Sequence, residues 1–194
     1  MDNGAQKCYN INVTVVFVAR SEKVNVLVFS DSHGRADKIN EALSLQITKP
    51  TAIVFLGDGL RDLDAINADE IPVYSVCGNC DGGFAAMLSD AADEQVIFVG
   101  GKRIFITHGH KYHVKSVLSP LVMRARELQA DIVLFGHTHK GFELTLDKDN
   151  EFGAVLEKTL YIMNPGSIGS YPYCFGNIEI DREGRVLMSH GSLK

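Results

Sequence analysis

The sequence predicts an α/β domain in which short strands alternate with helices and pair largely in parallel. Apolar, β-branched runs of four to seven residues recur without polar alternation, which is typical of strands buried on both faces. Helical patterns separate the early runs, as a sheet with parallel pairing requires. After His139 the helices give way to strands and turns, which predicts a second, mostly antiparallel sheet packed on the first.

The first residues stand apart from this pattern. Ile11–Ala19 is apolar, but Asn12 and Thr14 interrupt it and it is too short to span a bilayer. The start also lacks the basic residues and small-residue cleavage site of a secretory signal. We expect residues 1–23 to be an N-terminal extension or an edge strand, and residues 24–194 to form a single domain.

Five apolar runs from Val24 onward each stop abruptly at Gly, Asp, Asn or His. With the polar motifs that follow them, they are Val24–Phe29 before Ser30–His33, Ala52–Leu56 before Gly57–Gly59, Val73–Val76 before Cys77–Asp81, Arg103–Ile106 before Thr107–His110, and Ile132–Phe135 before Gly136–His139. Ligands of such sheets collect beyond the carboxyl ends of the strands. Five motifs at five strand ends therefore predict one shared site.

Two helices and four later strands complete the prediction. One helix, Ala36–Leu45, places Ile39, Ala42, Leu43 and Leu45 near one face. The second runs to Gln129, with Ser119 as N-cap, Pro120 at the first helical position, and Leu121, Val122, Ala125 and Leu128 facing inward. The later strands are predicted at Phe142–Leu146, Val155–Met163, Asn177–Ile180 and Val186–His190, with turns at Asp147–Asn150 and Asp181–Gly184.

The composition of the chain limits the classes of molecule that it is expected to bind. The chain has 194 residues, a net charge of −5 and no basic run, which argues against a dedicated nucleic-acid-binding surface. A small phosphorylated substrate remains compatible, because bound metal ions would supply positive charge. We expect no membrane segment, a cytoplasmic location, and reduced thiols at Cys8, Cys77, Cys80 and Cys174. The sequence leaves the oligomeric state open, a homo-oligomer included.

The residues at the strand ends are of the types that hold metal ions. The candidate ligands are Asp31, His33, Asp58, Asn79, His108, His137 and His139. Mixed oxygen and nitrogen donors suit Mn²⁺, Fe²⁺, Zn²⁺, Ni²⁺ or Co²⁺ better than Ca²⁺ or Mg²⁺. Seven ligands exceed the needs of one ion, and they serve two ions if one carboxylate, such as that of Asp58, is shared.

Each piece taken alone has an ordinary structural explanation. A Gly-Asp after a strand is more often a turn or a helix cap, and an isolated surface histidine is usually only solvated. Cys77-Gly78-Asn79-Cys80 is formally a redox or zinc motif, but Cys77 ends a strand and a second Cys pair is missing. It is the joint occurrence of five motifs that favours a metal centre.

These motifs resemble the five signature blocks of the calcineurin-like metallophosphoesterases, and most closely the small bacterial and archaeal phosphodiesterase branch (the YfcE-like proteins). The matching blocks are Ser30–His33, Gly57-Asp58, Gly78–Asp81, His108–His110 and Gly136–His139, with Asn164–Ser167 as a further shared segment. The resemblance covers the chain from Val24 to its end. It implies a four-layer α-β-β-α sandwich, with two mixed sheets face to face and helices outside.

The resemblance also implies how the ligands divide. One metal ion would be held by Asp31, His33, Asp58 and His139, and the other by Asp58, Asn79, His108 and His137. Phosphate esters, most of all phosphodiesters, would be hydrolysed by a hydroxide that bridges two cations about 3.5–4 Å apart. Mn²⁺ is the first choice of metal.

One departure from the family pattern concerns protonation of the leaving group. Many relatives carry His after the third-block Asn, and this chain has Cys80 there, which is a poor general acid. His110 is the substitute to test, so we expect Asp58, Asn79 and His110 to take part in catalysis; the alternative for His110 is a supporting or merely exposed position. Asp81 is expected either to orient Asn79 or His108 or to be a turn residue at the start of a helix. The alternative is a non-catalytic protein-interaction scaffold, because the retromer subunit of this fold has lost its metal ligands.

Overall fold

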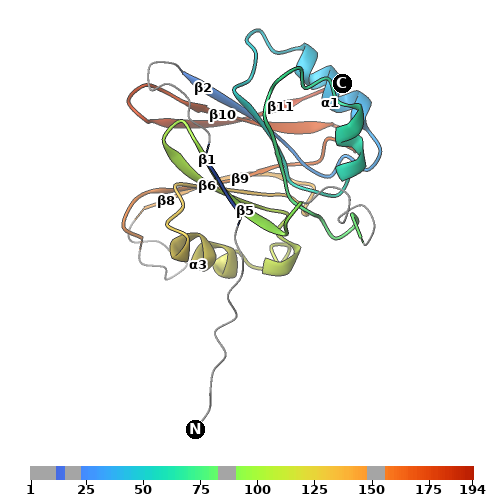
Figure 1. Ribbon diagram of the computed structural model, residues 1–194. Helices are drawn as coiled ribbons and strands as arrows, with labels where there is room; N and C mark the ends of the chain where they lie inside the picture. The colour runs from blue at the N-terminus through green and yellow to red at the C-terminus, as the bar shows by residue number, and fades with distance from the viewer. Residues whose placement is uncertain (1–11, 16–22, 83–90, 148–155) are drawn as a thin grey trace.

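Two β-sheets lie face to face in the computed structural model, which describes residues 12–15, 23–82, 91–147 and 156–194 (Figure 1). Helix α3 (Ser119–Glu127) covers the outer face of the lower sheet, and α1 (Ala36–Ser44) lies on the outer side of the upper one. This arrangement confirms the four-layer α-β-β-α sandwich with two mixed sheets.

The upper sheet has five strands in the order β11-β10-β2-β3-β4. Their bounds are β2 Val24–Phe29, β3 Ala52–Phe55, β4 Val73–Ser75, β10 Cys174–Ile180 and β11 Val186–Ser192. Strands β2, β3 and β4 pair in parallel, whereas β10 pairs antiparallel with both β2 and β11. The parallel strands therefore end along one edge of the sheet.

The lower sheet has six strands in the order β1-β5-β6-β7-β9-β8. Their bounds are β1 Asn12–Val15, β5 Glu94–Val99, β6 Lys102–Thr107, β7 Ile132–Phe135, β8 Gly141–Leu146 and β9 Leu160–Pro165. Strands β6, β7 and β9 are parallel, and β5 and β8 run antiparallel to their neighbours β6 and β9. Strand β1 pairs in parallel with β5 at the sheet edge.

The sequence prediction divided the strands between the sheets wrongly. It placed the early strands together and the late strands in a second sheet, but β6 and β7 belong to the lower sheet and β10 and β11 extend the upper one. Strand β5 was not predicted. An apolar run buried on both faces has the same pattern in either sheet, so the run itself does not specify its partner strand.

Alternate side chains of the central strands pack into different layers. In β2, Val24, Val26 and Val28 lie in the core between the sheets, whereas Leu27 and Phe29 pack towards α1. In β6 and β7 the same alternation sends one set of side chains between the sheets and the other set, with Phe105 and Phe135, towards α3. Both faces of each sheet are thus buried at these central strands, which explains their unbroken apolar runs.

The helices agree with the prediction except near their ends. Ile39 and Ala42 of α1 are buried, but Leu45 follows the helix and is 63% exposed, so its predicted inward position is wrong. Ser119 is the first residue of α3 rather than its N-cap, which is Leu118. Two short 3-10 helices, η1 (Leu60–Ala65) and η2 (His110–Tyr112), follow strand ends.

Four predicted features fall wholly or partly outside the part of the chain that the structure describes. These are the thiol of Cys8, the N-terminal segment 1–23 except residues 12–15 and 23, the turn Asp147–Asn150, and the start of the predicted strand Val155–Met163, whose observed counterpart is β9. Within the described ranges, the structure has no helix of the length and hydropathy that a membrane crossing requires.

Candidate metal centre

The five polar motifs follow the carboxyl ends of β2, β3, β4, β6 and β7 and contact one another. The backbone N–H of Asp31 donates to the carbonyl of Gly57 at 2.9 Å, which joins the first motif to the second. The N–H of His137 donates to Asp31 Oδ2 at 3.1 Å, and His108 Nδ1 lies 2.7 Å from the carbonyl oxygen of Leu56. The latter two contacts connect the two sheets at this end of the sandwich.

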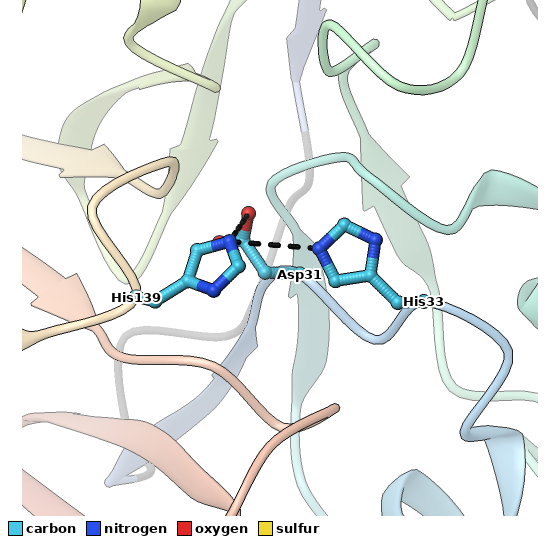
Figure 2. A group of neighbouring side chains, drawn as sticks. All are labelled: Asp31, His33 and His139. Carbon is cyan, nitrogen blue, oxygen red and sulfur yellow. Dashed lines mark hydrogen bonds and ion pairs between the residues drawn. The ribbon is translucent and has the colours of Figure 1, made fainter.

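Asp31, His33 and His139 form one group of possible metal ligands (Figure 2). His139 Nε2 lies 3.1 Å from Asp31 Oδ1 and 3.5 Å from His33 Nε2. Figure 2 shows the three side chains converging from two loops, with Asp31 between the two imidazoles. One carboxylate oxygen and two imidazole nitrogens therefore face a common point.

The carboxylate of Asp31 has one oxygen engaged and one available. Ser30 Oγ donates to Oδ2 at 2.5 Å, and the N–H of His137 donates to the same oxygen at 3.1 Å. Asp31 Oδ1 is buried and receives no hydrogen bond from the described residues. An unsatisfied buried carboxylate oxygen is costly, and a cation beside His33 and His139 would satisfy it. The group therefore fits a metal ion, because Asp31 Oδ1 has no hydrogen bond and His139 Nε2, 3.1 Å away, would bind the same cation.

Asp58, His108 and His137 form a second group, from both sheets. His108 Nδ1 faces a carbonyl oxygen, so in the neutral ring the proton lies on Nδ1 and Nε2 has a lone pair for a metal ion. That Nε2 lies 3.4 Å from Asp58 Oδ2 and 3.1 Å from Asn79 Oδ1. Three electron-pair donors that converge in this way fit a bound cation.

Asp58 also belongs to a third group, with His33 and Cys80. Its Oδ1 accepts the N–H of Cys80 at 2.7 Å, while Oδ2 faces His108. His33 connects the first group to this third one, and Asp58 connects the third group to the second. The structure thus brings all seven sequence-predicted ligands to one end of the sandwich, with Asp58 in the middle.

Charges within the centre shift the pKa values of its groups. Burial acts to raise the pKa of Asp58, but hydrogen bonds from His108 and the Cys80 amide outweigh it and hold that pKa well below the usual range. Burial, followed by the positive charges of His108 and Lys115, lowers the pKa of His137 to about 4. At neutral pH Asp58 is ionised and His137 is neutral, which are the forms that bind metal ions.

His110, the candidate proton donor, lies beside this centre. Its ring centroid is 5.4 Å from that of His108 and 6.1 Å from that of His137. Its Nδ1 is buried and has no hydrogen-bond partner among the described residues. Burial, then the charge of His108, lowers the pKa of His110. The structure therefore places His110 close to the metal ligands without a structural bond at that nitrogen.

The backbone at the centre adopts an uncommon conformation. Five of the seven candidate ligands have positive φ, namely Asp31 (56°), His33 (45°), Asp58 (58°), His137 (68°) and His139 (60°). A left-handed backbone is rare outside glycine and costs about 1–3 kcal/mol per residue, and such residues gather at functional sites. Local sequence preferences alone would not produce this cluster, which supports a functional origin.

Several residues that hold the ligands were missed or misread in the sequence. Asp81 does not orient the side chains of Asn79 or His108, as expected, but accepts four backbone N–H groups from the loops after β3 and β4. Asn164 Nδ2 donates to the Gly136 carbonyl at 2.7 Å and Ser167 Oγ to the Asp31 carbonyl at 2.9 Å. The shared Asn164–Ser167 segment was a signal for these contacts, but their partners lie far away in the sequence.

The thiols form no disulfide among the described residues. Cys77, Cys80 and Cys174 are free, and Cys77 is buried with its Sγ directed to the carbonyl of Ala91 at 2.9 Å. Burial raises the pKa of Cys77 to about 11. A buried thiol with a high pKa does not suit a redox motif.

Comparison with known proteins identifies relatives over most of the chain. The sequence model of the calcineurin-like phosphoesterase superfamily domain matches residues 24–183. The probable metallophosphoesterase YsnB of Bacillus subtilis (strain 168) is 32% identical over 145 residues, which cover 75% of each chain.

Solved structures share the fold at lower sequence identity. Vacuolar protein sorting 29 from Cryptosporidium parvum superposes with a TM-score of 0.63 at 19% identity, covering 88% of this chain and 98% of the other. An archaeal phosphodiesterase superposes with a TM-score of 0.61 at 19% identity, covering 87% of this chain and 100% of the other.

Proposed function

The chain belongs to the calcineurin-like phosphoesterase superfamily, and from this premise we propose that it is a phosphodiesterase whose centre holds two divalent metal ions. The observation that carries the proposal is the position of Asp58, which shares one group of possible ligands with His33 and another with His108 and His137. A carboxylate between two sets of donors is what a pair of cations requires.

In this proposal each ion has four ligands. Asp31, His33, Asp58 and His139 would hold one ion, and Asp58, Asn79, His108 and His137 the other. When bound, two such cations activate a water molecule and neutralise charge on the phosphate oxygens. Mn²⁺ is our first choice, with Fe²⁺, Zn²⁺, Ni²⁺ and Co²⁺ also suited to mixed oxygen and nitrogen donors.

The residues of the chain have separate tasks in this reaction. Asp58 and Asn79 keep their oxygens on one side of His108 and so fix the geometry in which the phosphate binds. His110 would give a proton to the departing oxygen. The lowered pKa of His110 favours the neutral ring at pH 7, which carries a proton on only one of its two nitrogens. A phosphate anion bound beside the ring would raise this pKa and favour the protonated form. We therefore propose diesters with good leaving groups as the preferred substrates.

The environment of the thiols supports a reducing compartment such as the cytoplasm, because Cys77, Cys80 and Cys174 are all unpaired. We propose that residues 24–194 act as one catalytic domain with residues 1–23 as an extension to it.

A hydrolysis assay tests the proposal. Metal-free protein, Mn²⁺-loaded protein and an Asp58→Asn variant are compared on bis(p-nitrophenyl) phosphate and on p-nitrophenyl phosphate. We expect Mn²⁺-dependent release of p-nitrophenol, faster from the diester, and a loss of at least about 100-fold in Asp58→Asn. The exposed Asp64 on η1 provides a matched control, Asp64→Asn, which should keep full activity. Equal turnover in Asp58→Asn and the unmodified protein would reject the role of Asp58. Absence of turnover with every metal would favour a protein-interaction scaffold.

A further inference from the structure

A cavity of about 570 Å³ adjoins the metal centre on the side of α3. We call it the Phe142 pocket. Its apolar lining comes from Val114, Leu118, Phe135 and Phe142, with Thr138 on the wall nearest the centre. Lys115 and Lys140 complete the lining, and both are exposed. The pocket therefore combines an apolar interior with two cationic side chains.

The pocket touches the metal centre through two of its motifs. Thr138 lies between His137 and His139, and its hydroxyl accepts a hydrogen bond from Asn164 Nδ2 at 3.0 Å. On the other side, a Cβ on Gly109 would lie only 2.9 Å from Val114 Cγ2, so the pocket wall packs against the residue that follows His108. A substrate held at the centre could therefore extend into the pocket.

The apolar part of the pocket is suited to an aromatic group. Phe135 and Phe142 pack edge to face, with ring centroids 6.2 Å apart and an interplanar angle of 62°. Phe135 is buried, but Phe142 is only half-buried, so its ring is accessible from the pocket. A further aromatic ring could pack on that exposed surface in the same way.

The two lysines give the pocket a charge preference. Neither Lys115 nor Lys140 forms an ion pair with a described residue, whereas Lys111 and Lys158 pair with Asp93 and Asp131. Lys115 also acts electrostatically on His137. Two unpaired cations beside an apolar cavity attract an anionic group that enters it.

We infer that the Phe142 pocket is a specificity site for a phosphodiester in which one esterified alcohol carries an aromatic ring and a second negative charge, as a nucleotide does. This inference rests on the proposed function. Lys115 and Lys140 would bind the second anion, and Phe142 would stack on the ring. Metal ligands set the reaction, and this pocket would select the substrate.

Three diesters that share p-nitrophenol as the leaving group separate the contribution of the ring from that of the charge. They are methyl, phenyl and 4-carboxyphenyl p-nitrophenyl phosphate. In the unmodified protein kcat/KM should rise along this series. Phe142→Ala should reduce the phenyl-to-methyl ratio about fivefold. The double variant Lys115→Met, Lys140→Met should reduce the carboxyphenyl-to-phenyl ratio about fivefold to tenfold. Because each ratio is formed within one variant, an effect on the metal centre that is common to all three esters cancels. The control Lys102→Met lies at the amino end of β6, away from the centre, and should change no ratio.

A binding measurement keeps the inference independent of turnover. Calorimetric titration of the Mn²⁺-loaded protein with 4-carboxyphenyl phosphate should give weaker binding in both pocket variants, and titration with inorganic phosphate should not. Unchanged ester ratios together with unchanged binding would overturn the inference while leaving the phosphodiesterase intact. Weaker binding in the variants, with no ester hydrolysed by any form, would instead support the pocket and reject the proposed reaction.

Discussion

The carboxylate of Asp81 accepts the backbone N–H of Asp58, with 2.7 Å between Oδ2 and N. The same carboxylate accepts the N–H groups of Gly59, Leu60 and Gly78 at 2.8 to 2.9 Å. Asp81, which follows β4, thus holds the left-handed backbone of Asp58, which follows β3. Asp58 is the residue at which the two proposed ligand sets meet. Asp81 acts on the centre by holding Asp58 in place.

Replacement of Asp81 by Asn should weaken metal binding without removing a ligand. An amide has one acceptor oxygen, and its NH₂ group would face N–H donors, so at least two of the four bonds would be lost. Loss of a contact that orients a metal ligand typically costs about 10–100-fold in affinity. Competition with a chromophoric chelator measures Mn²⁺ affinity in Asp81→Asn and in the control Asp64→Asn. Unchanged affinity in Asp81→Asn would show that the Asp58 loop keeps its shape unaided.

Gly136 is a position where a single methyl group should disrupt the centre. A Cβ there would lie 1.9 Å from Ser30 Oγ, closer than any real contact permits, and 3.0 Å from Asp31 Oδ2, which is also tight. Gly136→Ala should therefore displace Ser30 or Asp31 and lower the free energy of unfolding by about 1–3 kcal/mol or more. Urea denaturation measures the change. Gly82→Ala, where a Cβ meets nothing within 4 Å, is the matched control and should remain within about 0.5 kcal/mol of the original.

The positions of the candidate ligands at strand ends could be predicted from the sequence, because each candidate follows a strand that can be read locally. The run Val24–Phe29 is apolar throughout and stops at Ser30, so the position of Asp31 at a strand end follows directly. Parallel pairing then brings Asp31 and Asp58 to the same edge. The positions and chemical types of the candidate ligands could therefore be predicted from the apolar runs, the residues at which they stop, and the side chains found there.

The pairing of strands and the supporting bonds could not be read in this way. Strand β10 pairs antiparallel with β2, although Cys174 and Phe29 are far apart in the sequence. The bonds of Asp81 and Asn164 to distant backbone groups depend on that tertiary arrangement. The residue type shows that a side chain can accept or donate a hydrogen bond. The identity of its partner depends on the folded chain.

The stability of the protein should be more sensitive to a negative charge at position 164 than to a change in the size of the side chain. Its Nδ2 donates to the Gly136 carbonyl and to Thr138 Oγ, while Oδ1 accepts the N–H of Gly166. Asn164→Asp keeps the shape but places a buried carboxylate against the Gly136 carbonyl, which should cost about 1–3 kcal/mol or more. Thermal unfolding measures the loss. Because an aspartic acid with a protonated carboxyl could donate again, stability should partly recover as the pH falls. A variant as stable as the original at pH 8 would contradict these assignments.

Metal ions should stabilise the folded protein through Asp31. Its buried Oδ1 has no hydrogen bond from the described residues, so a cation that satisfies it binds the folded chain selectively. At a concentration 100 times the dissociation constant, such an ion adds about 2.7 kcal/mol to the free energy of unfolding. Titration of Mn²⁺ should raise the melting temperature of the original protein and of Asp64→Asn. Asp31→Asn should lose most of this increase, and an equal increase in that variant would exclude Asp31 as a ligand.

The thiols Cys77 and Cys80 should react separately and should not form a redox pair. Burial, followed by the charge of Asp81, raises the pKa of Cys77 to about 11, whereas Cys80 is exposed. At pH 8 only roughly 0.1% of Cys77 is thiolate, so iodoacetamide should modify Cys80 first, as mass spectrometry of digested protein would show. The folded state disfavours the Cys77 thiolate, so its contribution to stability is complete below the unfolded pKa of about 8.5 and is lost as the pH rises through 11. Incubation with oxidised glutathione should leave Cys77 reduced, and a Cys77–Cys80 disulfide in the native protein would restore the redox interpretation of this motif.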